Sequence, residues 1–254
     1  GLSVKDVEKA ILAHPEAKAV LVNNPTYYGV CADLKGIIQL AHAHGMKVLC
    51  DEAHGTHFYF SDLLPPGGMQ LGADMAACSV HKTGGSLTQS AVLLCGDGVP
   101  AGYVRQVINL AQTTSGSYLL MASLDFARRN LALHGAEMVR KTIERAEYAR
   151  EEINALGGYY AFGQEIVDGK ARCAFDTTKL SVHTRDIGLA GVEVYDLLRD
   201  EYDIQLEFGD IGNFLAVVTA GDRDLEIERL ISALSEIKRL YGGDSAGLLV
   251  NEYI

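Results

Sequence analysis

Residues 17–24 (AKAVLVNN), 33–45 (DLKGIIQLAHAHG) and 47–51 (KVLCD) decide the fold class of this chain. The first and last stretches are short apolar runs bounded by polar residues, a pattern typical of buried strands. The middle stretch has apolar residues at helical spacing and ends in Gly45. Two strands joined by a helix form a βαβ unit, so we predict parallel strands with a right-handed crossover.

The same patterns predict an α/β region followed by a small α+β region. Ser3 and Asp6 resemble a capping box that opens a helix over residues 3–13, and residues 117–156 have a nearly continuous helical pattern. We expect one domain over residues 1–138 and a second over 139–254. Further strands are predicted at 75–80, 91–95, 178–184, 204–210 and 214–221, and further helices at 191–202 and 224–241.

Composition indicates an ordinary globular protein. The chain has 254 residues, of which 48% are hydrophobic and 22% charged. Its net charge of -11 and the lack of a basic run argue against nucleic acid as a partner. There is no apolar run of about 18 residues and no signal peptide, so we expect no membrane partner and a cytoplasmic location. The chain begins at Gly1 without a methionine, from which we expect a fragment.

The five cysteines, at positions 31, 50, 78, 95 and 173, are odd in number and show no C-x-x-C spacing. Four of them lie within or beside apolar, strand-like runs. We therefore expect the cysteines to be small buried hydrophobic residues.

Two charged residues follow predicted parallel strands. Asp51 ends the strand at 47–51, and Lys82 lies just after the strand at 75–80. Ligands of open α/β sheets bind at the carboxyl ends of the strands. A lysine that forms a Schiff base and an aspartate that keeps a pyridine nitrogen protonated are what pyridoxal phosphate (PLP) chemistry requires. Ser79 and His81 add donors beside Lys82, and the pair Gly84–Gly85 lets backbone approach a phosphate.

Other interpretations of these residues exist. A lysine taken alone is usually a solvated loop residue, and an aspartate after a strand is often a turn or helix-capping residue. Asp51, His54 and His57 have donor types found in metal sites, but H-G-T-H lacks the helical context that would aim both rings at one ion, so we expect no metal. Asp176 and Glu207 are expected to be solvated, with contact of one of them with the substrate as the alternative.

Residues 77–91 (ACSVHKTGGSLTQSA) resemble the lysine-attachment signature of the Orn/Lys/Arg decarboxylase family, which consists of PLP enzymes of fold type I. Residues 23–34 (NNPTYYGVCADL), 51–58 (DEAHGTHF) and 64–74 (LPPGGMQLGAD) are similar to the same family in order and spacing. The resemblance implies an α/β large domain with a mostly parallel sheet, followed by a small α+β domain. Because family members are longer, it also implies that the N-terminal part of the large domain and a C-terminal domain are lacking.

The resemblance implies roles for seven residues of this sequence. Lys82 would bind PLP covalently, Asp51 would pair with the pyridinium, Ser79 and His81 would contact the phosphate, Ala53 would pack on a ring face, His54 would lie near the ring hydroxyl or the substrate carboxylate, and Thr26 would reach the ring edge.

The expected reaction is PLP-dependent decarboxylation of lysine, arginine or ornithine to a di- or polyamine and CO2. One alternative is an aminotransferase or another fold type I enzyme, for which Arg172, Arg185 and Arg199 are candidate carboxylate clamps. A second is a truncated remnant without catalytic activity. Fold type I sites usually form between two subunits, so we expect a homodimer or higher homo-oligomer.

Overall fold

The structure is a computed structural model, and it describes residues 1–243. They fall into two compact units: the first contains Gly1–Val139 and Val167–Asp176, and the second contains Arg140–Ile166 and the chain from Thr177 onward. We expected residues 167–176 in the second domain, but they belong to the first unit. The reason is that strand β7 (Ala174–Phe175) pairs with β2 (Val30–Cys31). Residues 244–254 of the expected small domain lie outside the described residues.

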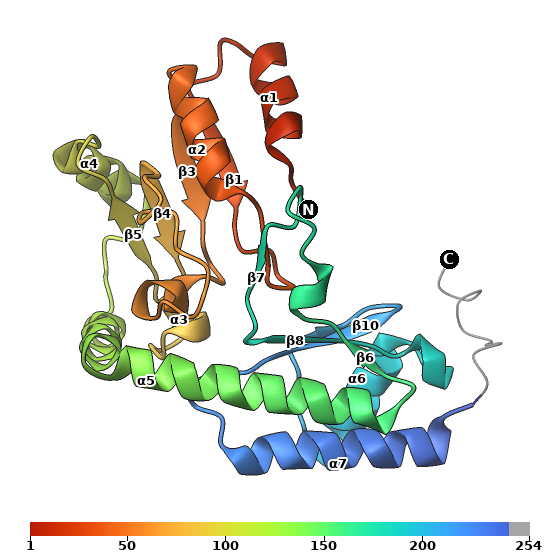
Figure 1. The fold of residues 1–254 in the computed structure, drawn as a ribbon. Coiled ribbons are helices and arrows are strands. Elements are labelled where there is room, and N and C mark those ends of the chain that lie inside the picture. Colours follow the sequence, from red (N-terminus) through yellow and green to blue (C-terminus); the bar gives the residue numbers. More distant parts are fainter. Residues whose placement is uncertain (244–254) are drawn as a thin grey trace. The chain divides into compact units, whose positions relative to one another are not determined.

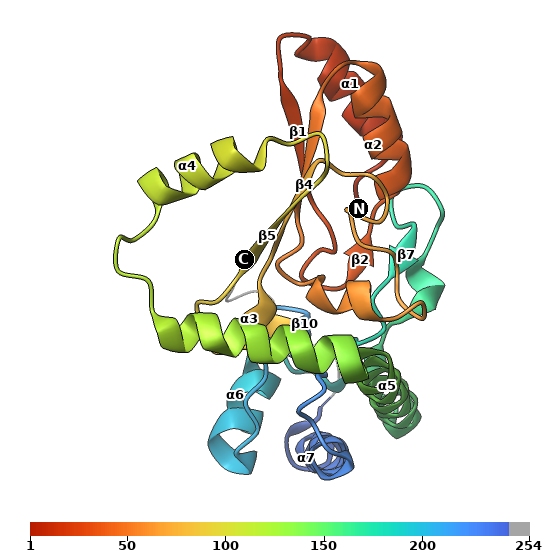
Figure 2. The same cartoon turned by 90° about the vertical axis from the view of Figure 1, so that its left-hand side faces the viewer.

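A four-stranded sheet organises the first unit, in the order β1-β3-β4-β5. Strands β1, β3 and β4 are parallel and β5 is antiparallel to β4, so the predicted parallel βαβ unit is confirmed. Helices α1 and α2 lie on the same face of the sheet (Figures 1 and 2). The bounds are α1 Val4–Ala13, β1 Ala19–Asn23, α2 Leu34–Ala43, β3 Lys47–Asp51, β4 Met75–Cys78 and β5 Val92–Cys95.

The two faces of this sheet differ in burial. Val48 and Cys50 point into a core that is completed by Ile37 of α2. On the opposite face Leu21 is 73% exposed and Leu93 is 39% exposed. We call this second surface the open face. Because side chains alternate along a strand, it includes Leu21, Asn23, Leu49, Asp51, Met75, Ala77, Leu93 and Cys95.

Short elements complete the first unit. Lys82 lies on a one-turn helix, α3 (Val80–Thr83), which begins within the stretch 75–80 that we predicted as a strand. Helix α4 (Ala101–Ala111) was not predicted, and it has no buried residue. The expectation of buried cysteines is wrong for Cys95, which is exposed, and only partly right for Cys173. The 3-10 helix η1 covers Thr56–Phe60, and α5 (Tyr118–Leu156) begins in this unit and ends in the second.

The second unit is a small α+β body built on an antiparallel sheet of order β6-β8-β10-β9. Leu180 and Phe214 of this sheet are fully buried against Leu198 and Leu234 of helices α6 and α7. The strand expected at 204–210 is shorter than predicted. The bounds are β6 Tyr160–Ala161, β8 Lys179–His183, α6 Gly191–Tyr202, β9 Phe208–Gly209, β10 Asn213–Val217 and α7 Asp224–Tyr241, with 3-10 helices at Gln164–Ile166 and Arg185–Ile187.

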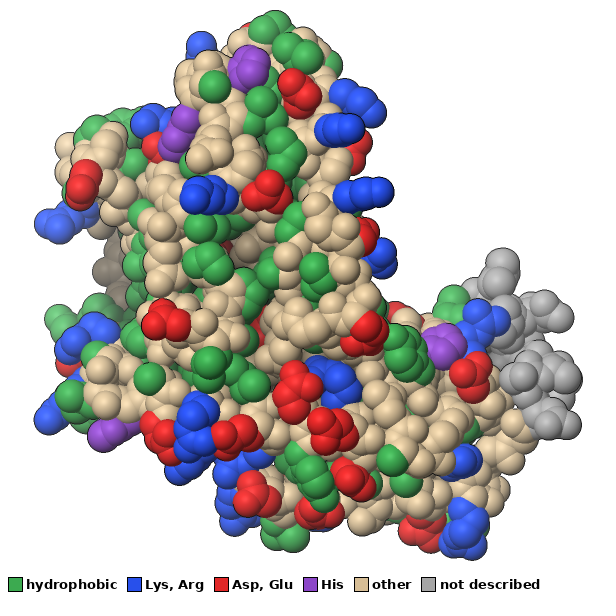
Figure 3. Space-filling model, in the orientation of Figure 1, with side chains coloured by type: hydrophobic (Ala, Val, Ile, Leu, Met, Phe, Trp, Pro, Cys, Tyr) green, Lys and Arg blue, Asp and Glu red, His purple; other side chains and the backbone are tan. Residues whose placement is uncertain are grey.

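Charges are mixed on the surface. On the face shown in Figure 3, basic and acidic side chains are interspersed, and the described residues there form no continuous positive patch. Among the described residues, no helix is both long and apolar enough to cross a membrane.

Candidate active site

Asp51 is the last residue of β3, the second strand of the sheet. It is in register with Asn23 of β1 and Ala77 of β4. Its side chain is half-buried on the open face, and its Oδ1 accepts a hydrogen bond from the backbone N–H of Ala53 at 3.1 Å. Its carbonyl oxygen accepts from the N–H of Asn24 at 3.0 Å. A carboxylate is therefore held at the carboxyl end of a central parallel strand.

Lys82 follows the neighbouring strand β4 and lies on the exposed side of helix α3. Its Nζ lies 3.0 Å from Nε2 of His54 and 5.8 Å from the centre of the Tyr27 ring. Since an ammonium group only donates, a neutral His54 accepts this hydrogen bond at Nε2. The amine of Lys82 thus contacts side chains from two other segments, those of His54 and Tyr27.

His54 and Tyr27 form the wall beside Lys82. His54 is 5% exposed, and its ring centre lies 4.3 Å from that of Tyr27 with the planes tilted by 57°. Tyr27 is 39% exposed and so belongs to an accessible surface. Thr26 differs from these residues, because its Oγ1 accepts from the N–H of Val30 at 3.1 Å and so closes its own turn.

Ser79 and His81 lie on either side of the start of α3. The Ser79 hydroxyl oxygen accepts no capping hydrogen bond from the first turn of this helix. Nδ1 of His81 lies 2.8 Å from the carbonyl oxygen of Ser90, a contact that requires a proton on Nδ1. Nε2 of His81 therefore donates to an anion only when the ring is protonated.

The two glycines that follow have clear steric roles. A Cβ on Gly84 would lie 2.7 Å from Cγ1 of Val80, and Gly85 has φ +84°. Both positions therefore favour glycine, which allows the tight exit from α3.

A buried carboxyl group next to Asp51 was missed by the sequence analysis. Glu52 is fully buried, and its oxygens accept hydrogen bonds from the N–H of Gly68 at 2.7 Å and from the hydroxyl of Tyr59. The alternation along β3 was a usable signal, because Val48, Cys50 and Glu52 share the face that points to the core.

Asp176 corrects a second expectation. We expected a solvated side chain, but Asp176 is fully buried, and its Oδ2 lies 2.9 Å from Nε2 of His57. Its backbone N–H also donates to the carbonyl of Gly29, which holds β7 against the turn that carries Tyr27. Glu207 is exposed, as expected.

The residues considered for other sites contact their own neighbours or lie exposed. Within residues 1–243, no three His, Cys, Asp or Glu side chains are arranged to hold a metal ion. Among the arginines considered as carboxylate clamps, Arg172 pairs with Asp168 and Arg199 pairs with Asp200, while Arg185 is exposed.

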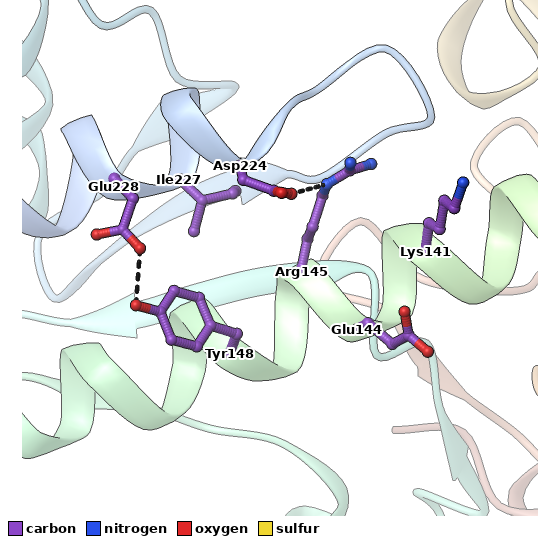
Figure 4. A pocket seen from close by; sticks show the side chains of 7 residues that line it. All are labelled: Lys141, Glu144, Arg145, Tyr148, Asp224, Ile227 and Glu228. Atoms are coloured by element: carbon purple, nitrogen blue, oxygen red, sulfur yellow. Dashed lines mark hydrogen bonds and ion pairs between the residues drawn. The ribbon is translucent and has the colours of Figure 1, made fainter.

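The second unit contains a charged groove between α5 and α7 (Figure 4). Arg145 Nε donates to Asp224 at 2.7 Å, and the hydroxyl of Tyr148 donates to Glu228 at 2.7 Å. These pairs bridge the two helices, so we interpret the groove as a helix–helix contact.

Comparison with known proteins identifies sequence relatives over nearly the whole chain. An arginine decarboxylase of Halalkalibacterium halodurans is 47% identical over 242 residues, which cover 95% of this chain and 49% of the relative. An arginine decarboxylase of Bacillus subtilis is 45% identical, with 93% and 49% covered. The chain therefore spans about half the length of the curated relatives it matches.

Solved structures share the fold at lower identity. A Francisella novicida lysine decarboxylase superimposes with a TM-score of 0.80 at 18% identity, covering 95% of this chain and 40% of that one. A Bacillus subtilis ureidoglycine–glyoxylate aminotransferase gives a TM-score of 0.73 at 13% identity, covering 95% and 65%. The predicted fold class, an α/β sheet of fold type I with a small α+β domain, is thus confirmed. Residues 2–223 match the family described as Orn/Lys/Arg decarboxylase, major domain, and the chain belongs to this family.

Proposed function

We propose that this chain carries the cofactor-attachment half of a PLP-dependent decarboxylase of basic amino acids. The observation that supports this most directly is the position of Asp51 and Lys82 after the carboxyl ends of adjacent parallel strands, in a chain of the Orn/Lys/Arg decarboxylase family. Family membership implies PLP as the cofactor.

The donors present fit this cofactor. Asp51 offers a carboxylate on the open face, and its neighbour in register on that face is the small residue Ala77. Lys82 offers a primary amine, while Ser79 and His81 offer a hydroxyl and an imidazole at the start of α3. These are the groups needed for a pyridinium, an aldehyde and a phosphate.

Each side chain has a defined task in the proposal. PLP, when bound, supplies the electron sink for the electron pair left by departing CO2. Asp51 stabilises a proton on the pyridine nitrogen through its negative charge. Lys82 would hold the cofactor through its amine, and its Nζ would hold or move a proton at the site. His54 positions that Nζ, Ala53 packs on a ring face, and Thr26 lies at the edge of the site.

We further propose arginine as the preferred substrate, because the relatives that are 44–47% identical are named arginine decarboxylases. The product would be the corresponding amine, a precursor type for polyamines. As in other fold type I enzymes, the active unit would be a homodimer or a larger homo-oligomer.

The test is release of labelled CO2 from arginine, lysine and ornithine by a polypeptide of the relatives' length that carries this chain. We expect release to be fastest with arginine. Formation of a keto acid without CO2 would instead favour the aminotransferase alternative, and the absence of both reactions with PLP bound would favour a non-catalytic remnant.

A further inference from the structure

The carboxyl group of Glu52 connects several segments of the first unit. Its Oε1 accepts from the N–H of Gly68 at 2.7 Å, and its Oε2 accepts from the hydroxyl of Tyr59. The same hydroxyl oxygen accepts from the N–H of Met69 at 3.2 Å. Sγ of Cys78 lies 4.0 Å from Oε2. We call Glu52, Tyr59, Gly68, Met69 and Cys78 the Glu52 network.

The network holds the chain on both sides of the candidate site. Glu52 directly follows Asp51, and Cys78 directly precedes Ser79, from which α3 and Lys82 follow. The two strands are also joined here by the backbone, because the N–H of Glu52 donates to the carbonyl of Ala77 at 2.9 Å. Asp51 and Lys82 therefore both leave the sheet next to atoms that this network holds.

Residues 65–68 (P-P-G-G) pass close to side chains of the Glu52 network and its neighbours. A Cβ on Gly67 would lie 2.4 Å from Cζ of the Tyr59 ring, and a Cβ on Gly68 would lie 2.7 Å from Sγ of Cys50. Glycine at both positions lets the backbone come close enough for the N–H of Gly68 to reach Glu52. This accounts for a motif that the cofactor contacts leave unexplained.

Burial makes the network sensitive to substitution. Glu52 and Cys78 are both shielded from water. Burial raises the pKa of Glu52, while the hydrogen bonds from Tyr59 and Gly68 lower it again in part. Burial and the nearby carboxyl group also raise the pKa of Cys78 to about 12. A buried acceptor that loses its donor is costly, so the three segments are expected to move together when one partner is removed.

We propose that Glu52 and Tyr59 are a positioning pair that sets the place of Asp51 relative to Lys82. The pair acts through the strand ends and touches neither cofactor nor substrate. The proposal rests on the proposed function, since it is this function that gives the Asp51–Lys82 geometry its importance. The proposal gives Glu52 a positioning role that is separate from the pyridinium role proposed for Asp51.

The experiment compares Glu52→Ala, Glu52→Gln and Tyr59→Phe in a polypeptide of the relatives' length. The matched control is Asp74→Asn, since Asp74 is a carboxyl group of the same sheet, 9% exposed, that bonds the N–H of Val48 near the amino ends of β3 and β4. Measurements are Tm, the Kd of PLP for the apoprotein, and kcat and KM for CO2 release.

We expect Glu52→Ala to lower kcat by at least about tenfold and to weaken PLP binding, because small displacements of reacting groups reduce rates steeply. Glu52→Gln keeps the acceptor for Gly68, so it should lose less. Tyr59→Phe, the mildest change, should lower kcat even where Glu52→Ala fails to fold. Asp74→Asn should lower Tm while leaving kcat and the Kd of PLP near the wild-type values.

Two results separate failure of this inference from failure of the proposed function. If Glu52→Ala and Tyr59→Phe lower Tm like Asp74→Asn but retain wild-type kcat and PLP affinity, the pair is purely structural and the inference is wrong. If the wild-type polypeptide neither attaches PLP to Lys82 nor releases CO2, the proposed function is wrong.

Discussion

Lys82 and Asp51 are the residues on which the proposed function depends. We predict that borohydride reduction of the PLP-loaded polypeptide of full relative length, followed by peptide mapping, places the pyridoxyl label on Lys82. Lys82→Ala should abolish labelling. Lys47→Ala is the control, because this lysine pairs with Asp74 at the start of β3 and its loss should leave labelling intact. A label on a different lysine in the wild-type protein would contradict the assignment.

Asp51 is predicted to be needed for turnover more than for cofactor retention. Asp51→Ala should leave PLP bound to Lys82 and lower kcat by about 100-fold or more, because one preorganised electrostatic contact is commonly worth that much. Asp51→Glu keeps the charge and should be less damaged. Steady-state kinetics together with the absorbance of bound PLP measure both effects; an Asp51→Ala variant with most of its activity would rule out the pyridinium role.

The sequence located some residues of this site better than others. Strand-end positions led to Lys82 and Asp51, the family resemblance added His54, and the structure places the amine of Lys82 against His54. The cofactor roles of all seven predicted residues stay predictions. Glu52 was missed because the alternation that places it on the core face was not extended past Asp51, where the predicted strand ends. Its partners Tyr59 and Gly68 come from segments whose proximity only the fold creates.

At the scale of elements, Asp74 joins the starts of β3 and β4 in a pH-dependent way. Burial alone would raise its pKa, but hydrogen bonds from Lys47, the N–H of Val48 and His42 outweigh this and lower the pKa from 3.8 to about 2. A carboxyl group whose pKa is lower in the folded than in the unfolded chain stabilises the fold at pH values above its unfolded pKa. This stabilisation is lost as the pH falls through the folded pKa.

We therefore predict that Asp74→Asn lowers the free energy of unfolding by about 2 kcal/mol at pH 7. The difference from wild type should shrink as pH falls from about 4 toward 2. Urea titrations across this range provide the measurement. Asp62→Asn, at an exposed position, is the control and should change little at any pH. A pH-independent difference for Asp74→Asn would show that its charge is not the cause.

Helix α4 is predicted to be the least protected helix of the chain described. None of its side chains is buried, whereas α2, of similar length, buries Leu34, Ile37, Ile38 and Ala41. Isolated helices of this length are marginal in water, because most helical stability comes from packing. In hydrogen exchange on this chain, amides of α4 should exchange much faster than those of α2. Equal protection would mean that α4 is packed against another surface, such as a second copy.

The elements whose bounds were predicted correctly are those that pack against a core. Helices 191–202 and 224–241 and the strand 47–51 were predicted with the observed bounds, because each has a regular apolar face that meets a core. Helix α4 was overlooked, and it buries none of its side chains among the described residues. Strands β2 and β7 are two residues long and exist only as partners of each other, which no local pattern reveals.

At the scale of the whole molecule, the first sheet has a sequence suited to burial on both faces. Strand AVLVN is apolar at every position but the last and KVLCD at its three inner positions, as in sheets covered on both sides. Helices cover one face, while the open face exposes Leu21 and Leu93 and carries Asp51. The cofactor ring proposed to pair with Asp51 would therefore lie on an exposed surface of this chain.

We predict that residues 1–254 alone bind PLP weakly or not at all and do not release CO2. Lys82 and Asp51 hold only part of the cofactor, and a site loosened by about 1 Å loses on the order of 100-fold in rate. Exposed apolar surface and unpaired strand edges should also make this chain self-associate. PLP titration monitored by absorbance, CO2 release and sedimentation test the three expectations, with the polypeptide of the relatives' length as the control. Stoichiometric PLP binding and full turnover by residues 1–254 would mean instead that the site is complete within this chain, and that the open face needs no further cover for catalysis.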